Sequence, residues 1–287
     1  MLNIENLIEN EISNGYGDIN ARAKVCQDII LKAISTGSLN KNVTIKGGVV
    51  MRSKTNNIRR ATQDLDIDFV RYSLADSSID AFIEKLNCID GIIIKRTGKI
   101  EELKQQDYHG KRVHLQISDN FNHTILSKLD LGVHNKFSVE QEEYCFDIAF
   151  DNEGASLLIN SNEQMFTEKL RSLLRFGPVS TRYKDVFDMF YLCQKIDKSK
   201  LHICFDSYIF KDEGMRENNI SDILKRVNLA FSDKFYKKSL SETDKKWIDE
   251  PIDIILDTIV IFLKELEKIF YFNFSLKTRN LRYNIIT

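Results

Sequence analysis

The stretch of residues 46–69 constrains this chain more than any other, because it joins two glycines to a row of aspartates. Its sequence is KGGVVMRSKTNNIRRATQDLDIDF. Side chains of a strand alternate between its faces, so one face is expected to carry Asp64, Asp66 and Asp68. Like charges on one face repel each other, and a bound divalent cation with oxygen ligands removes that repulsion. The row therefore predicts a metal site. Alternation alone leaves open which pair binds, and a solvated strand face is the alternative.

Gly47 and Gly48 follow an apolar run and are predicted to form a tight turn. Because glycines lack a Cβ atom, backbone N–H groups there can approach a ligand closely, and such groups bind phosphate at a turn or at a helix start. A plain structural turn is the alternative, and no GxxxxGK[ST] sequence of a P-loop is present. The following segment is expected to be a basic loop.

The formal net charge of −1 over 287 residues excludes a protein coated in positive potential. Any contact with nucleic acid must therefore use a local basic patch. The candidates are Arg52, Lys54, Arg59 and Arg60 in the loop, and Lys277, Arg279 and Arg282 in the tail. Five widely spaced cysteines without a CxxC pattern, and a start without a signal peptide, predict a cytoplasmic protein with reduced thiols. No membrane segment is expected.

Apolar periodicity divides the chain into a mixed part and a helical part, with a boundary near residue 160. In the first part, helices are expected at 3–13, 20–36 and 76–89, and strands at 42–46, 64–71, 91–97, 111–118, 124–131 and 144–149. In the second part, helices are expected at 163–175, 182–195, 216–231 and 241–271. The pattern predicts an α+β fold with two domains, 1–160 and 161–287.

Four charged residues in apolar surroundings are further candidates. Asp130 in KLDLG is either a surface residue of an edge strand or a third carboxylate, acting as metal ligand or base. Lys169 either extends along an apolar stripe with its ammonium in water or binds nucleotide phosphate. Asp185 and Asp188 share a helix face and are either structural, paired with Arg182 or Lys184, or part of the site.

In this order, these features resemble the AbiEii-type nucleotidyltransferases, which are toxins of type IV toxin–antitoxin and abortive-infection systems related to the MenT toxins. The resemblance covers roughly residues 40–195. It rests on KGG (46–48), RATQDLDIDF (60–69), KLDLG (128–132), TEKLRSLLR (167–175) and TRYKDVFDMFYL (181–192).

The resemblance implies a polymerase-β-like mixed-sheet core in residues 1–160, followed by a helical domain that contributes Lys169 and Asp188 to the site. It implies that Asp64 and Asp66 bind Mg²⁺, or alternatively Mn²⁺, with Asp130 as a third ligand. The implied catalytic set is Asp64, Asp66, Asp130, Lys169 and Asp188, with Asp185 as the alternative to Asp188. The implied nucleotide-binding set is Lys46, Gly47, Gly48, Arg60, Thr62, Lys169 and Asp185.

The expected activity is transfer of a nucleoside monophosphate from an NTP to an acceptor hydroxyl, with release of pyrophosphate. The resemblance suggests the 3′ end of tRNA as acceptor and an AbiEi-type antitoxin encoded nearby, without need of a stable complex. The alternatives are a protein or an aminoglycoside-like small molecule as acceptor, or a non-catalytic module that binds RNA or protein.

Overall fold

The computed structural model describes the backbone of residues 2–103 and 110–283, and the side chains of these residues up to 269. The chain divides into two compact units, Met1–Ser161 and Asn162–Thr287, which are described separately. The first unit is a mixed sheet with helices and the second is helical, so the predicted α+β class is confirmed.

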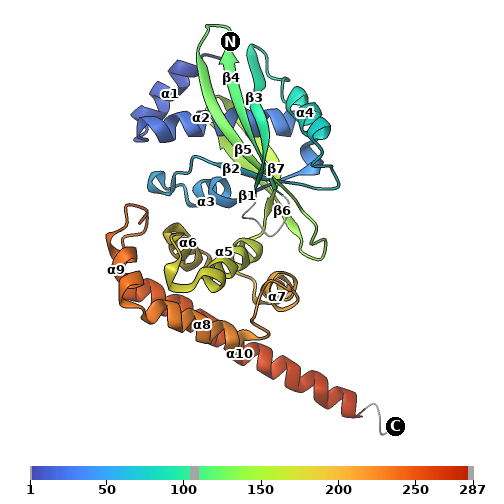
Figure 1. Ribbon diagram of the computed structural model, residues 1–287, viewed down its shortest axis with the longest axis vertical. Helices are drawn as coiled ribbons and strands as arrows, with labels where there is room; N and C mark the ends of the chain where they lie inside the picture. Colours follow the sequence, from blue (N-terminus) through green and yellow to red (C-terminus); the bar gives the residue numbers. More distant parts are fainter. Residues whose placement is uncertain (1, 104–109, 284–287) are drawn as a thin grey trace. The chain divides into compact units, whose positions relative to one another are not determined.

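The first unit is built on one mixed sheet, which has seven strands among the described residues (Figure 1). The strand order is β3-β4-β5-β2-β1-β7-β6. The bounds are β1 Val43–Lys46, β2 Leu65–Phe69, β3 Ile92–Leu103, β4 Gly110–Asp119, β5 Thr124–Val133, β6 Gln141–Ile148 and β7 Asp151–Asn160. The neighbouring pairs β1–β7 and β2–β5 are parallel, and the other neighbouring pairs are antiparallel.

Among its described residues, the first unit has the α-helices α1 Ile4–Ser13, α2 Asp18–Thr36, α3 Gly47–Thr55 and α4 Asp76–Lys85. Helix α2 packs across β5, β6 and β7, and α4 packs on β3. An apolar core lies between these helices and the sheet. Strand β2 contributes every second side chain to it: Leu65, Ile67 and Phe69 are fully buried. The carboxylates of the same strand are thereby directed to the other face.

The segment after Gly48 differs from its prediction. It forms α3 rather than a loop, and Gly47 and Gly48 are its first residues rather than a free turn. The helix ends at Asn56, whose left-handed backbone (φ 47°) is a conformation that asparagine tolerates. The helix turns Arg52 inward, where it is buried.

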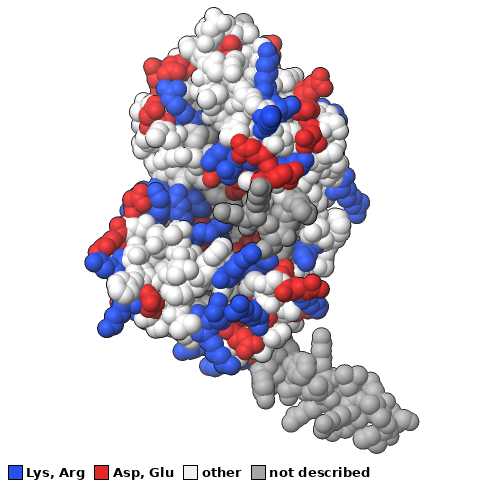
Figure 2. Space-filling model, in the orientation of Figure 1, with Lys and Arg blue, Asp and Glu red and all other residues white. Residues whose placement is uncertain are grey.

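The four basic residues of this segment therefore do not form one exposed patch. Arg60 is also buried, in the short 3₁₀ turn Ile58–Arg60, and Lys54 pairs with Glu142 at 3.1 Å, whereas Arg59 is exposed. Figure 2 shows acidic and basic side chains interspersed over the visible face, as the net charge of −1 suggests. The side chains of the basic tail, Lys277, Arg279 and Arg282, lie outside the described residues.

Strand β7 was not predicted, although it lies inside the sheet, between β1 and the edge strand β6. Its first residues are polar, with Asp151 and Glu153 acidic, and the apolar alternation begins only at Ala155, after Gly154. The signal that remains, with Leu157 and Ile159 buried, is too short to distinguish a strand from the start of the next helix.

The second unit contains the helices α5 Asn162–Phe176, α6 Tyr183–Cys193, α7 Lys198–Phe205, α8 Ile220–Ser232, α9 Lys234–Glu242 and α10 Ile252–Tyr283. Helix α6 packs against α5 and α10, and α8 packs against α10 and α5.

The prediction of a single helix at 241–271 is wrong. Residues 243–251 separate α9 from α10, and Pro251 stands immediately before α10, because proline fits a helix start but not its interior. Helix α7 was not predicted. Among the described residues, none of the helices is long and apolar enough to span a bilayer.

Candidate active site

A row of charged residues crosses the sheet of the first unit. Strand pairing places Lys46 of β1 opposite Asp66 of β2, Asp66 opposite Asp130 of β5, and Asp130 opposite Arg112 of β4. Residues opposite each other in adjacent strands share one face and lie within side-chain reach. The structure therefore brings together two of the predicted carboxylates, Asp66 and Asp130. They are 64 positions apart in the chain and meet because β2 and β5 pair in parallel.

The glycine pair lies directly against the predicted site. A Cβ atom on Gly47 would lie 2.3 Å from Oδ2 of Asp66, and one on Gly48 would lie 2.5 Å from Oγ1 of Thr62. Gly47 also has a φ of +68°, a conformation that glycine adopts without strain. The free backbone N–H groups at the start of α3 therefore lie beside the carboxylate of Asp66, an arrangement that can hold phosphate next to a carboxylate-bound cation.

Asp64 lies immediately before β2, and its side chain is partly accessible to water. Its carboxylate Oδ1 is 2.7 Å from Nζ of Lys128, and the two side chains are 46% and 37% exposed. An ion pair this exposed is weak, because water competes for both charges. Asp64 can therefore exchange Lys128 for a cation without a large penalty.

Asp130 is held differently. Arg112 donates two hydrogen bonds to it, each 2.7 Å long, from Nε to Oδ1 and from Nη2 to Oδ2. These hydrogen bonds raise the pKa of Arg112 above its usual range, so the guanidinium stays charged. Two-point pairing of this kind is among the stronger ion pairs. As a metal ligand or a base, Asp130 would have to share its oxygens with Arg112.

Lys46 and Asp68 form a buried pair at the end of β1. The distance from Nζ of Lys46 to Oδ1 of Asp68 is 2.6 Å, and both side chains are about one-tenth exposed or less. His134 is also buried, and its burial lowers its pKa, against the opposing effect of nearby Asp68. Asp68 therefore serves to neutralise Lys46. Of the three aspartates Asp64, Asp66 and Asp68, the first two are the accessible ones.

A buried polar network, which sequence patterns did not indicate, holds the segment that precedes β2. Gln27 of α2, fully buried, donates through Nε2 to the carbonyl oxygens of Thr62 (2.9 Å) and Asp64 (3.4 Å). Its own Oε1 accepts a 2.6 Å hydrogen bond from Nη1 of Arg52 in α3. The network links the glycine helix to the carboxylate segment and so fixes their relative position.

The described residues contain no group of three or more His, Cys, Asp or Glu side chains arranged as a ready metal cage. Mg²⁺ does not require one, since it is usually held by one or two carboxylates together with substrate phosphates and water. Asp64 and Asp66 supply two carboxylates, and the amides of α3 supply the place for phosphate. The residues present fit a two-carboxylate Mg²⁺ site that substrate completes.

The second unit contains its own charged cluster. Nζ of Lys169, on α5, lies 2.7 Å from Oδ2 of Asp188 and 3.1 Å from Oδ1 of Asp185, both on α6. Asp185 also pairs with Arg182 at 2.6 Å, and Trp247 donates through Nε1 to Oδ1 of Asp188 at 3.1 Å. Lys169 is buried, so its ammonium does not extend into water as one interpretation of the sequence had it.

Comparison with known proteins gives the chain its family. The model of the nucleotidyltransferase AbiEii toxins of type IV toxin–antitoxin systems matches residues 29–257. No curated protein matches the chain in sequence. Among solved structures, an antigenic nucleotidyltransferase-like protein from Paracoccidioides brasiliensis is similar, with 13% identity and a TM-score of 0.44, over 77% of this chain and 92% of that one. The family match spans most of the chain and confirms the predicted resemblance: the chain belongs to the AbiEii nucleotidyltransferase toxins of type IV toxin–antitoxin systems.

Proposed function

We propose that this chain transfers a nucleoside monophosphate from an NTP to an acceptor hydroxyl and releases pyrophosphate, in a reaction that depends on Mg²⁺, with Mn²⁺ as a possible substitute. The observation that supports this most directly is the contact between Gly47 and Asp66. A side chain on Gly47 would collide with the Asp66 carboxylate, so the phosphate-binding helix start and the metal-binding strand adjoin without anything between them.

Each group in the first unit has a defined task in this proposal. The N–H groups at Gly47 and Gly48 bind the phosphates of the NTP, because the start of a helix carries unpaired donors and partial positive charge. Asp64 and Asp66 hold the cation, which when bound supplies charge neutralisation for the phosphates. Thr62 lies against the helix start at Gly48. Arg60 and Lys46 are assigned to the nucleotide, although Lys46 is already paired with Asp68.

The same proposal gives the second unit a part in phosphate binding. Lys169 is assigned to nucleotide phosphate and Asp188, or alternatively Asp185, to a supporting role. Two buried carboxylates already pair with Lys169. Its effect on the stability of the unit and its effect on phosphate binding therefore have to be measured separately. Variants of Lys169, described in the Discussion, test this assignment.

Membership of a toxin–antitoxin family implies an antitoxin partner. We propose the 3′ end of tRNA as acceptor and an AbiEi-type antitoxin encoded nearby, which need not form a stable complex. The acceptor hydroxyl would attack the α-phosphorus, forming a new P–O bond as the bond from the α-phosphorus to the bridging oxygen breaks and pyrophosphate leaves. The hydroxyl proton would pass to a base, for which Asp130 is the candidate.

A labelling experiment tests the proposal. The purified chain is incubated with Mg²⁺, each α-³²P-labelled NTP in turn, and total tRNA or a protein extract. Asp64→Ala/Asp66→Ala is the inactive variant, and Asp147→Ala, which removes an exposed carboxylate of β6, is the matched control. Label on tRNA that the double variant abolishes and the control retains would support the proposal. Label on protein would replace tRNA as acceptor, and no label on either would contradict transfer to RNA or protein.

A further inference from the structure

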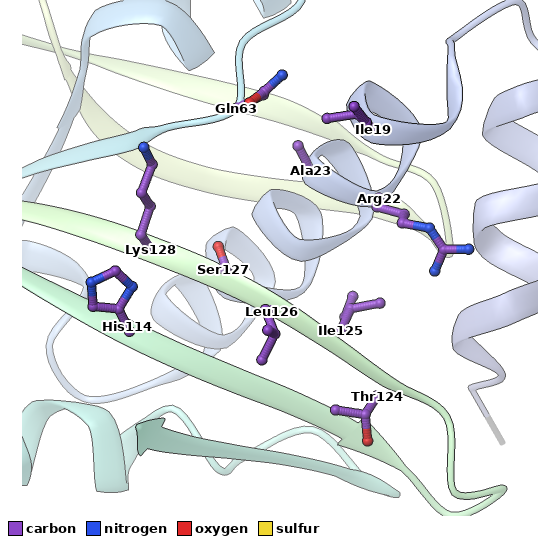
Figure 3. A pocket seen from close by; sticks show the side chains of 10 residues that line it. All are labelled: Ile19, Arg22, Ala23, Gln63, His114, Thr124, Ile125, Leu126, Ser127 and Lys128. Carbon is purple, nitrogen blue, oxygen red and sulfur yellow. The ribbon is translucent and has the colours of Figure 1, made fainter. Parts of the chain in front are cut away.

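The pocket beside Asp64, of about 450 Å³, has basic walls whose charges are already paired (Figure 3). Its basic lining residues are Arg22, His114 and Lys128. Each of them lies 2.7 to 3.2 Å from a carboxylate oxygen. A buried polar group that lacks a partner is more informative than these pairs, because native proteins seldom retain such a group without a reason.

The phenol of Tyr236 is a group of this kind. Tyr236 lies near the start of α9 in the second unit and is 2% exposed. Its hydroxyl is buried and has no hydrogen-bond partner among the described residues. Burial of a polar group without a hydrogen bond costs stability, and a phenylalanine at this position would avoid that cost. The hydroxyl therefore destabilises this state of the protein, and its presence needs another explanation.

The local structure of α9 holds the ring in this position. Asp233 caps the helix by accepting a 2.8 Å hydrogen bond from the backbone N–H of Tyr236. Leu240, one turn later, is also fully buried, whereas Phe235 is 84% exposed. The helix thus buries the aromatic residue that carries a hydroxyl and leaves the adjacent phenylalanine in water. A need to bury an aromatic ring does not account for the tyrosine.

The hydroxyl lies near the cluster of Lys169, Asp185 and Asp188. The Tyr236 ring is tilted against that of Tyr183, the first residue of α6, with the ring centroids 6.0 Å apart. Burial raises the pKa of the Tyr236 hydroxyl, and the negative charge of Asp185 raises it further. The phenol therefore stays protonated and can donate a hydrogen bond, and Asp185 is the carboxylate whose charge reaches it.

Phosphate binding by Lys169 would create a need for such a donor. In this structure Asp185 accepts at Oδ1 from Lys169 (3.1 Å) and at Oδ2 from Arg182 (2.6 Å). The shorter contact of Lys169 is with Oδ2 of Asp188, at 2.7 Å, and Nε1 of Trp247 donates to the other oxygen of Asp188. The longer contact, with Asp185, is thus the one that Lys169 gives up more easily. Oδ1 of Asp185 would then lose its donor, and water offsets little of that loss, because the side chain is only 9% exposed.

We propose that Tyr236 is a positioning residue of the reaction: its hydroxyl donates to Oδ1 of Asp185 when Lys169 turns from Asp185 to the nucleotide phosphate. Lys169 keeps Asp188 throughout, and Arg182 keeps Oδ2 of Asp185, so one hydrogen bond replaces another and no buried charge is left alone. The hydrogen bond that the free protein lacks is made in the nucleotide-bound protein, and it favours the bound state. This inference rests on the proposed assignment of Lys169 to phosphate.

Tyr236→Phe tests the inference, because it removes the hydroxyl and keeps the ring. Tyr183→Phe is the matched control, since it removes a hydroxyl from the neighbouring, partly exposed ring. The midpoint of urea unfolding is measured on each full chain without ligand. Binding of inorganic triphosphate with Mg²⁺ is measured by calorimetry, and nucleotidyl transfer by the labelling experiment.

We expect Tyr236→Phe to raise the urea midpoint, since it removes a buried group that has no partner. The same change should weaken the affinity for triphosphate by about tenfold, since the bound state loses a hydrogen bond to a carboxylate. Loss of a merely structural hydroxyl would not raise stability and weaken binding together. Tyr183→Phe should change neither quantity.

A second background tests whether Tyr236 acts through Asp185. Asp185→Ala removes the acceptor and leaves no buried charge alone, because Lys169 keeps Asp188 and the Arg182 side chain is 63% exposed. In this background Tyr236→Phe should no longer weaken triphosphate binding. A tenfold loss that persists there would overturn Asp185 as the acceptor.

A urea midpoint that Tyr236→Phe does not raise would overturn the inference, because the hydroxyl would then be satisfied already. Unchanged triphosphate affinity, an equal loss in Tyr183→Phe, or no triphosphate binding by the unmodified chain would overturn it as well. If triphosphate binding depends on Tyr236 but no nucleotide is transferred, the inference stands and the proposed reaction fails. If nucleotide is transferred and neither transfer nor triphosphate binding depends on Tyr236, the reaction stands and the inference fails.

Discussion

The two charged clusters of this protein use the same residue types and differ in how much water reaches them. In the sheet unit, Asp64 and Lys128 pair at 2.7 Å with side chains 46% and 37% exposed. In the helical unit, Lys169 and Asp188 also pair at 2.7 Å, but their side chains are 8% and 0% exposed. The two ion pairs therefore have the same length but differ in their exposure to water.

Exposure decides what each pair can do. A solvated pair contributes about 0–1 kcal/mol, so its members can separate and bind something else. A buried pair gains little on formation, but removal of one member leaves a charge without water or partner and costs about 3–5 kcal/mol. The comparison implies that the sheet cluster is free to exchange ligands, whereas the helical cluster must stay intact for its unit to fold.

The largest expected effect is on activity, at Asp66. Asp66→Ala removes one of the two accessible carboxylates and should lower nucleotidyl transfer by about three orders of magnitude or more, because several kcal/mol of charge stabilisation are lost. The free energy of unfolding in urea should change little, since the Asp66 side chain is only partly buried. Asp147→Ala, an exposed carboxylate change in the same sheet, should leave both quantities unchanged. A fully active Asp66→Ala protein would remove Asp66 from the site.

The next effect should appear in stability, at Lys169. Lys169→Met leaves Asp185 and Asp188 buried without their shared cation, and the free energy of unfolding in urea should fall by about 3–5 kcal/mol. Lys225→Met, at a 75% exposed lysine of the same unit, should change it by less than about 0.5 kcal/mol.

A double variant separates the structural role of Lys169 from a catalytic one. Lys169→Met/Asp188→Asn removes both charges of the pair, keeps an acceptor for Trp247, and leaves Asp185 with Arg182. Stability should recover in part. If nucleotidyl transfer recovers as well, Lys169 does not bind phosphate. If stability recovers without activity, a role of the Lys169–Asp188 pair in the reaction itself gains support.

A middle effect is expected at Gln27, which connects stability to activity in the sheet unit. Gln27→Leu takes the donor from buried carbonyl groups of the Asp64 segment and removes one of the acceptors of Arg52, which keeps Asp28, at a cost of about 1–3 kcal/mol. Because small displacements of site residues are costly, transfer should fall by about a hundredfold. Gln27→Glu keeps an acceptor for Arg52 but cannot donate to Thr62 or Asp64, so it should retain stability better than activity. Equal losses in both variants and both measurements would make Gln27 structural only.

The sequence predicted individual helices and strands better than it predicted which side chains contact each other. Alternation in β2 and the helical stripe of α2 are short-range signals, so both elements were predicted close to their observed bounds. Which charges meet is a long-range property. The pairing of Asp130 with Arg112 follows from the β4–β5 register, and the hydrogen bond from Gln27 to Thr62 follows from the packing of α2. Neither contact can be recognised from the local sequence. Burial of Lys169 likewise depends on how α6 covers α5.

The smallest expected effect on stability is at Lys128, and it tests the exposed side of the comparison. Lys128→Ala removes the partner of Asp64, and because that pair is solvated the free energy of unfolding should change by less than about 1 kcal/mol. Affinity for Mg²⁺, followed by calorimetry in the presence of a non-hydrolysable NTP, should not decrease, since the released Asp64 carboxylate no longer has to exchange a lysine for the cation. A loss of stability as large as that of Lys169→Met would show that the two clusters do not differ in the way their exposure indicates. A loss of Mg²⁺ affinity would show that Lys128 holds Asp64 in its binding position instead of competing with the cation.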